Sequence, residues 1–265
     1  MRRTLAKAGL AAAAALTLAL TGCDLLDGGA DGEDSTDGAV AGQEEADDPA
    51  LVLTSSAAAL GQESLRFEMT MGDMMTMTGA VDPTAEAAEM AMNMTVEGVS
   101  MEMQFIVIGT DTWMNMGELG AFFGATTPWM LVDLSRMDSD ALGFKPEASD
   151  PVGAEEMLQG LGEVERVDDR TFEGVIDLTV ASGNLIDDDM VALMGEQAST
   201  MTFTATIDDQ DRLSQMTIVV PELAELDVDA IEVRYFDYGA PIEITPPPAD
   251  QVSEMADDFY QMFEM

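Results

Sequence analysis

Histidine is absent from the 265 residues, and cysteine occurs once, as Cys23. Without histidine, neither a Ser–His–Asp nor a Cys–His arrangement can form, and a catalytic zinc site built on imidazole ligands is excluded. A single cysteine also excludes any disulfide within the chain. The sequence therefore predicts a protein that is not an enzyme, that needs no cofactor and that depends on its hydrophobic core for stability.

Basic side chains are also scarce. Ten Lys and Arg residues stand against 52 Asp and Glu residues, which gives a formal net charge of −42. Binding to nucleic acid depends on Lys and Arg side chains that neutralise phosphates, and this chain has no stripe of them. Anionic lipid headgroups would repel the same surface. We expect no nucleic acid partner and no membrane docking through surface charge.

The one long apolar run lies at residues 8–20, after three basic residues. It is too short to span a bilayer and ends on small residues, which is typical of an export signal. The sequence Leu-Thr-Gly-Cys at 20–23 resembles the bacterial lipobox, which directs lipidation of its cysteine and cleavage before it. We expect residues 1–22 to be a signal peptide and lipidated Cys23 to anchor the exported protein on the extracytoplasmic face of the cell membrane. The alternative is a plain secretory signal with an incidental cysteine.

The residues after the cysteine are dominated by Asp, Glu, Gly, Ser and Ala, and residues 24–48 contain no Lys or Arg. Such a stretch cannot bury enough apolar surface to offset the entropy lost on ordering. We interpret residues 23–48 as the lipidated cysteine with a flexible acidic linker. A folded domain is expected at 49–248, followed by a short amphipathic helix or tail at 249–265.

The folded part alternates apolar and polar residues with period two, as in "LRFEMTM" at 65–71. This pattern predicts about nine to eleven strands, and the short turns between them indicate antiparallel neighbours. Helices are expected at 47–62, 150–162 and 185–198, from their caps and their Gly and Pro positions. The sequence therefore predicts the α+β class.

Several segments resemble the actinobacterial LppX/LprG-type lipoproteins, which are relatives of the LolA-like lipoprotein carriers. They are the lipobox, the acidic linker, "PWMLVDLS", "GEVERVDDRTFEGV", "DDQDRLSQMTI" and "VRYFDYGAPIEITPPPADQV". The resemblance covers most of residues 50–252. It implies a curved antiparallel half-barrel whose concave side is closed by helices over an apolar cavity. It also implies binding or transfer of acylated lipid in the cell envelope, with a transporter as a possible partner.

Methionine is the residue in excess, with 23 copies, and it gathers in "MTMGDMMTMTG" (69–79) and "EMAMNMTVEGVSMEMQF" (89–105). Period-two spacing places the methionines of each strand on one face. Because methionine is unbranched and polarizable, such a face suits ligands of varying shape, such as acyl chains. The candidates for the lipid-binding cavity are Phe67, Met69, Met92, Met103, Phe105 and Trp113.

Two other functions fit the same methionines. Thioethers bind Cu(I), so a copper-binding lipoprotein is an alternative, with Met71, Met74 and Met75 as the candidate ligands. The second alternative is a structural or signalling lipoprotein in which this face is packed core without a cavity.

Overall fold

The computed structural model describes residues 48–96, 99–136, 154–180, 188–221 and 228–260. Contacts divide the chain into two units, Met1–Ala39 and Val40–Met265, and every described element belongs to the second unit. The predicted signal peptide, Cys23 and nearly all of the predicted linker lie outside the described residues.

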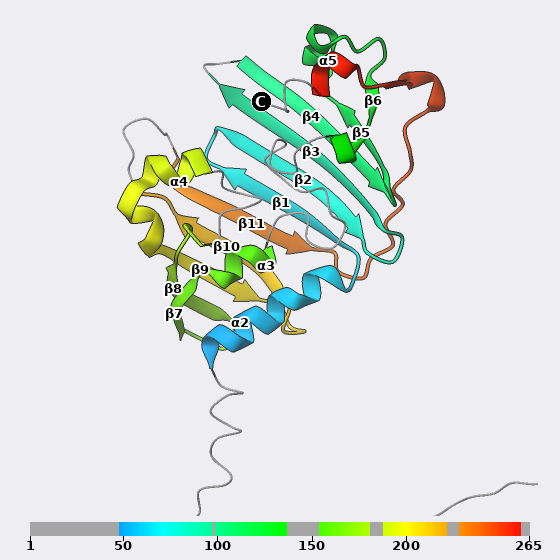
Figure 1. The fold of residues 1–265 in the computed structure, drawn as a ribbon. Coiled ribbons are helices and arrows are strands. Elements are labelled where there is room, and N and C mark those ends of the chain that lie inside the picture. Colours follow the sequence, from blue (N-terminus) through cyan, green and yellow to red (C-terminus); the bar gives the residue numbers. More distant parts are fainter. Residues whose placement is uncertain (1–47, 97–98, 137–153, 181–187, 222–227, 261–265) are drawn as a thin grey trace, which may run out of the picture. The chain divides into compact units, whose positions relative to one another are not determined.

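One sheet of twelve strands makes up most of the described part (Figure 1). The strands are β1 (Leu65–Met71), β2 (Met75–Asp82), β3 (Ala87–Val96), β4 (Val99–Ile108), β5 (Asp111–Asn115), β6 (Trp129–Val132), β7 (Leu161–Arg166), β8 (Thr171–Ile176), β9 (Met201–Ile207), β10 (Leu213–Val219), β11 (Ala230–Phe236) and β12 (Val252–Glu254). Their order across the sheet is β12-β6-β5-β4-β3-β2-β1-β11-β10-β9-β8-β7. Two meanders, β1–β6 and β7–β11, therefore meet where β1 pairs antiparallel with β11.

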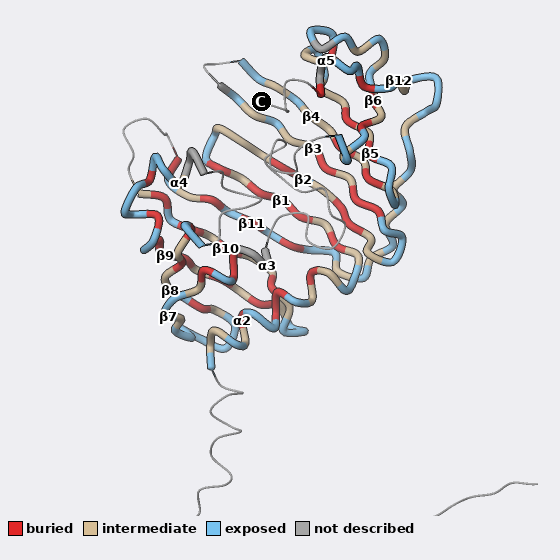
Figure 2. The backbone as a smooth tube through the Cα atoms, in the orientation of Figure 1, coloured by how far each residue is buried: buried red, intermediate tan, exposed pale blue. Residues whose placement is uncertain are grey.

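Side chains alternate between the two faces of this sheet, as extended backbone requires. In β1 the residues at positions 65, 67, 69 and 71 are buried, and the three residues between them are only half-buried (Figure 2). We call the side that carries Phe67, Met69 and their cross-strand partners the methionine face. The side that carries Arg66, Glu68 and their partners is the polar face.

The helices of the described chain are short. They are α2 (Pro49–Ala57), α3 (Ala154–Gln159), α4 (Asp188–Met194) and α5 (Asp257–Tyr260), with 3-10 turns η1 (Ala58–Gly61), η2 (Gly117–Phe123), η3 (Leu134–Arg136), η5 (Gly195–Thr200) and η6 (Ala249–Gln251). The start of α2 confirms the prediction, since the Asp48 carboxylate accepts a hydrogen bond from the Ala50 backbone N–H at 2.9 Å. With Leu53 and Ala57 buried, α2 packs on β7, β9, β10 and α3.

The expected fold, an α+β half-barrel with helices closing its concave side over an apolar cavity, is wrong. The sheet has twelve strands, is not closed and is mixed, because β12 runs parallel to β6. The helix predicted at 150–162 gives way to β7 at Leu161, and the one predicted at 185–198 loses its regular form at Gly195, whose φ is +59°. Described helices of nine residues or fewer are too short to cover twelve strands.

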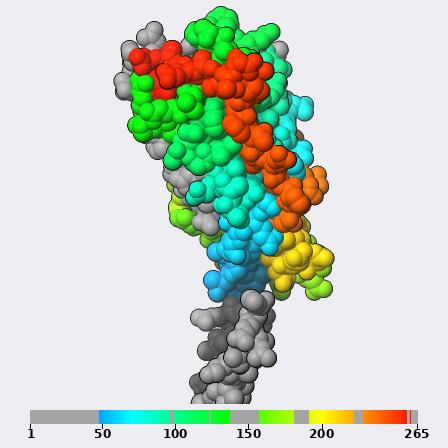
Figure 3. All heavy atoms as spheres, turned by 90° about the vertical axis from the view of Figure 1, so that its right-hand side faces the viewer, coloured from blue at the N-terminus to red at the C-terminus, as the bar shows by residue number. Residues whose placement is uncertain are grey.

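Residues 237–248 lead from β11 to the far edge of the sheet and lie along the side seen in Figure 3, in orange. At the start of this segment, the Gly239 N–H donates to the Ser64 carbonyl, and the Ser64 hydroxyl donates to the Ala240 carbonyl, each at 2.7 Å. The Tyr238 hydroxyl donates to the Leu213 carbonyl, and the Arg212 guanidinium lies 4.3 Å from the centre of the Tyr238 ring. These contacts fix the segment to the residue before β1 and to the start of β10.

The structure describes the segment predicted as a short amphipathic helix or tail, residues 249–265, as far as Tyr260. The strand β12 extends the sheet beyond β6, with the 3-10 turn η6 before it and the four-residue helix α5 after it. Tyr260 is buried and holds this segment in place, since its hydroxyl accepts a hydrogen bond from the Asp133 N–H at 2.8 Å. Arg136 lies 3.9 Å from the centre of the Tyr260 ring and pairs with Asp257 at 2.8 Å.

Candidate functional site

Two rows of methionines cross β1, β2, β3 and β4 on the methionine face. Cross-strand partners are Met69, Met77, Met92 and Met103 in the first row, and Met71, Met75, Met94 and Met101 in the second. The rows are neighbours, because each strand contributes two methionines that are separated by one residue. Directly opposite residues have Cβ atoms about 4.5–5.5 Å apart, so the eight thioethers form one continuous surface. We call these eight residues the methionine patch.

The turn between β1 and β2 sets the register of the patch. Gly72 has a φ of +52°, which glycine adopts without the steric cost that a side chain would add. The Met74 N–H donates to the Met71 carbonyl at 3.1 Å and closes the turn. The Met74 carbonyl in turn accepts a hydrogen bond from the Thr95 N–H at 2.8 Å, which joins the turn to β3. This geometry brings Met71 opposite Met75.

Burial decreases across the patch from β1 towards β4. Met69, Met71 and Met77 belong to the buried core, whereas the remaining five members are half-buried. The half-buried members are Met75, Met92, Met94, Met101 and Met103. The patch is therefore buried in the core at its β1 end and half-buried at its β4 end.

An aromatic row borders the patch. Phe67, Gly79, Met90 and Phe105 are cross-strand partners on the same four strands, next to the first methionine row. A Cβ added to Gly79 would lie 2.4 Å from the Phe67 ring, so the ring occupies the space above the glycine. The patch therefore has a rigid aromatic edge beside its flexible thioethers.

The structure brings together five of the six residues predicted for lipid binding. Phe67, Met69 and Phe105 are buried on the methionine face, and Met92 and Met103 are half-buried partners in the first row. Trp113 lies on the polar face instead, because its partner Ile106 points away from Phe105. A two-residue turn joins Ile108 to Asp111, and this turn decides which face the indole occupies.

The predicted copper ligands lie together at one end of the patch. Met71 and Met75 are direct partners, and Met74 is the turn residue between them, partly buried against the core. Sequence reasoning missed Met94 and Met101 as members of this group, since they come from a different hairpin. Their alternation was visible in the sequence, but their register against Met75 was not.

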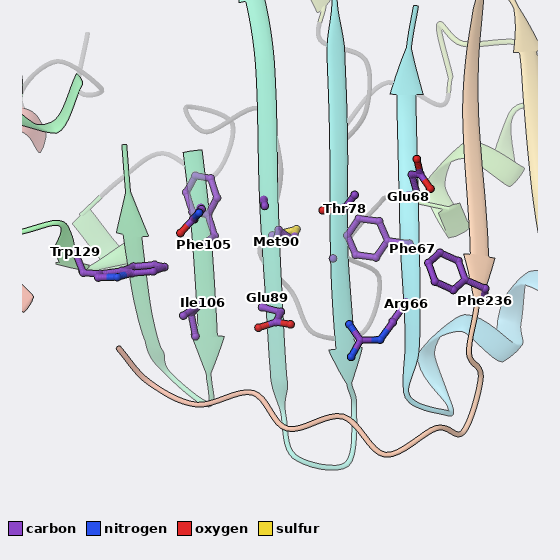
Figure 4. Close-up of a pocket in the computed structure, with 13 residues that line it drawn as sticks. Arg66, Phe67, Glu68, Thr78, Glu89, Met90, Phe105, Ile106, Trp129 and Phe236 are labelled. Atoms are coloured by element: carbon purple, nitrogen blue, oxygen red, sulfur yellow. The ribbon is translucent and has the colours of Figure 1, made fainter. Parts of the chain in front are cut away.

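A hollow of about 390 Å³ lies across β1–β4, and its lining includes Phe67, Met90 and Phe105 of the aromatic row. In Figure 4, Phe236 and Trp129 stand at its opposite ends, with Glu89 between them. Arg66 also lines it and lies 3.9 Å from the Asp237 carboxylate. The hollow therefore combines charged groups with two of the predicted lipid-binding residues, Phe67 and Phe105, whereas all eight residues of the methionine patch are uncharged.

Among the described residues, no three His, Cys, Asp or Glu side chains are grouped so as to hold a metal ion. Within the same ranges, no helix combines the length and apolarity needed to cross a bilayer. Comparison with protein-family models finds no match for this sequence, and comparison with curated proteins finds none either.

Proposed function

We propose that this protein is a membrane-anchored cell-envelope lipoprotein that binds, and can transfer, acylated lipid on its methionine face. The observation that carries the proposal is the methionine patch, in which eight thioethers from four strands form one uncharged surface. The lipobox ending in Cys23 and the resemblance to LppX/LprG-type lipoproteins support the same function. The ligand would lie against an open sheet face and not in a chamber closed by helices.

Acyl chains match this surface in chemistry. Each methylene that leaves water contributes about 0.8 kcal/mol, so a long chain gains affinity without any polar contact. Methionine has three rotatable bonds, so neighbouring side chains can adjust to chains of different length and unsaturation. A face of branched aliphatic residues would be stiffer, because Val and Ile have restricted χ1 rotamers.

We expect the acyl chain of the lipid to bind at the half-buried end of the patch. Met92 and Met103 face each other across β3 and β4, and both are partly exposed while packing against the core. Covering them with an acyl chain would remove their remaining apolar surface from water. Met69, already buried at the other end of the row, continues the apolar surface into the core.

Native mass spectrometry of the full chain, released from detergent micelles, tests this function. The double variant Met92→Gln and Met103→Gln places two amides on the surface, and the matched control Met92→Leu and Met103→Leu keeps it apolar at similar volume. We expect the wild type and the leucine control to retain bound lipid. The glutamine variant should bind it about tenfold more weakly or worse, since losing 1.4 kcal/mol already gives that factor.

Thermal unfolding of all three proteins shows whether they are folded. A folded glutamine variant that carries as much lipid as the wild type would overturn the proposal. A wild type that carries no lipid from an actinobacterial host, and takes up none from added diacyl lipid, would overturn it equally.

A further inference from the structure

The second row of the patch differs from the first in where it lies. Met71, Met75, Met94 and Met101 sit at the end of the sheet where the β1–β2 turn is located, and Met74 occupies that turn. Five thioethers from two separate hairpins, β1–β2 and β3–β4, therefore lie close together at one end of these strands. Their residue spacing in the sequence, from 71 to 101, gives no sign of this convergence.

We infer that these residues form a binding site for a soft monovalent metal ion, Cu(I) or its redox-inert analogue Ag(I). The principal ligands are Met71, Met75 and Met94, which occupy adjacent strands at one register position. Met101 and Met74 flank them. This inference does not rest on the proposed lipid function, because it needs only the sulfur atoms and not the apolar surface.

The spacing of the row suits one ion shared by several thioethers. Cross-strand neighbours have Cβ atoms about 4.5–5.5 Å apart, and each sulfur lies two bonds beyond its Cβ. The flexible side chains of adjacent strands can therefore direct their sulfurs to a common point. The Met74 carbonyl, bonded to the Thr95 N–H at 2.8 Å, holds the turn against β3 and keeps the two hairpins in register.

The chemistry of the row selects the metal. Thioether sulfur is a soft, neutral donor that prefers Cu(I) to hard ions such as Mg²⁺ or Ca²⁺. The carboxylate of Glu102 lies beside Met101 in the chain, and alternation places it on the polar face, away from the sulfurs. Because Met75, Met94 and Met101 are half-buried, an ion can reach the row from solvent.

The test compares two isosteric double variants of the full chain. Met75→Leu and Met94→Leu remove two sulfurs from the proposed site, while Met92→Leu and Met103→Leu remove two sulfurs from the neighbouring row. Affinity for Cu(I) is measured anaerobically by competition with a chromogenic Cu(I) chelator. We expect at least a tenfold loss of affinity in the first variant and little change in the second.

A second measurement locates the ion. With the methionine methyl groups labelled by carbon-13, titration with Ag(I) should shift the NMR signals of Met71, Met75 and Met94 before those of Met69 or Met92. The inference is overturned if the first variant binds Cu(I) as the wild type does, or if both variants lose affinity equally. Both variants keep the face apolar at similar volume, so a loss of Cu(I) affinity reports the missing sulfur atoms and not a disrupted face.

Discussion

At the scale of single residues, Thr112 stands out on the methionine face. It is 1 % exposed, and its hydroxyl has no hydrogen-bond partner in the described structure. Its cross-strand partners are Val107 and Val132, both buried. A buried hydroxyl without a partner costs free energy, because it has lost its hydrogen bonds to water.

We therefore expect Thr112→Val to stabilise the protein by about 1 kcal/mol, since it replaces the hydroxyl by a methyl group of the same shape. Urea unfolding of the full chain measures the change. Thr204→Val, on the polar face of β9, serves as the control and should have a much smaller effect. A loss of stability in Thr112→Val would mean that the hydroxyl is hydrogen-bonded after all.

The residue scale also shows where sequence reasoning about the site reached its limit. Alternation correctly grouped Met69, Met92 and Met103, because period two is a property of any extended strand. It failed for Trp113, whose face depends on how many residues the preceding turn contains. The rows themselves could not be predicted, since cross-strand register is set by turn geometry and not by the strand sequence.

At the scale of elements, the hairpins were predictable and the remote pairings were not. The pattern of "LRFEMTM" predicts β1 with its observed bounds, and "TMTFTATID" followed by "RLSQMTIVV" predicts the hairpin of β9 and β10. The pairing of β1 with β11 joins segments far apart in the chain, and no local signal specifies it. The parallel pairing of β12 with β6 was hidden by apolar spacing that also fits a helix.

The attachment of β12 makes an element-scale prediction. Tyr260 anchors the C-terminal segment through its hydroxyl, which accepts the Asp133 N–H. We expect Tyr260→Phe to destabilise the protein by about 1 kcal/mol, the usual contribution of one such hydrogen bond. Hydrogen exchange should show faster exchange at the Asp133 amide and in β12, while β9 and β10 stay protected.

Arg136→Gln is the comparison variant for Tyr260→Phe. Its ion pair with Asp257 is largely exposed, so removing it should cost less than removing the buried hydroxyl. If Arg136→Gln proved the more damaging change, the cation–π contact and the ion pair would anchor the segment in place of the Tyr260 hydroxyl.

At the scale of the whole molecule, the main feature is its large negative charge. With a net charge of −42, the folded chain repels itself, and screening weakens that repulsion. The Debye length falls from about 10 Å at 0.1 M salt to about 3 Å at 1 M. We expect the unfolding temperature to rise by several degrees between these two concentrations.

Differential scanning calorimetry in sodium chloride and in choline chloride measures this effect. Both salts should raise the unfolding temperature equally, because screening depends on ionic strength and not on the identity of the cation. A rise with sodium alone would indicate specific cation binding. A fall in both salts would show that attractive ion pairs, such as Arg212 with Asp208 at 2.6 Å, outweigh the repulsion.

The pairing of β1 with β11, which joins the two meanders, has a consequence for folding during synthesis. During synthesis β1 meets β2 almost at once, but its other edge waits for β11, whose Phe236 pairs with Arg66. Until β11 emerges, that edge offers unpaired N–H and C=O groups to any strand nearby. A chain interrupted before β11 would therefore keep β1 as an unpaired strand edge, and we expect such truncated chains to aggregate.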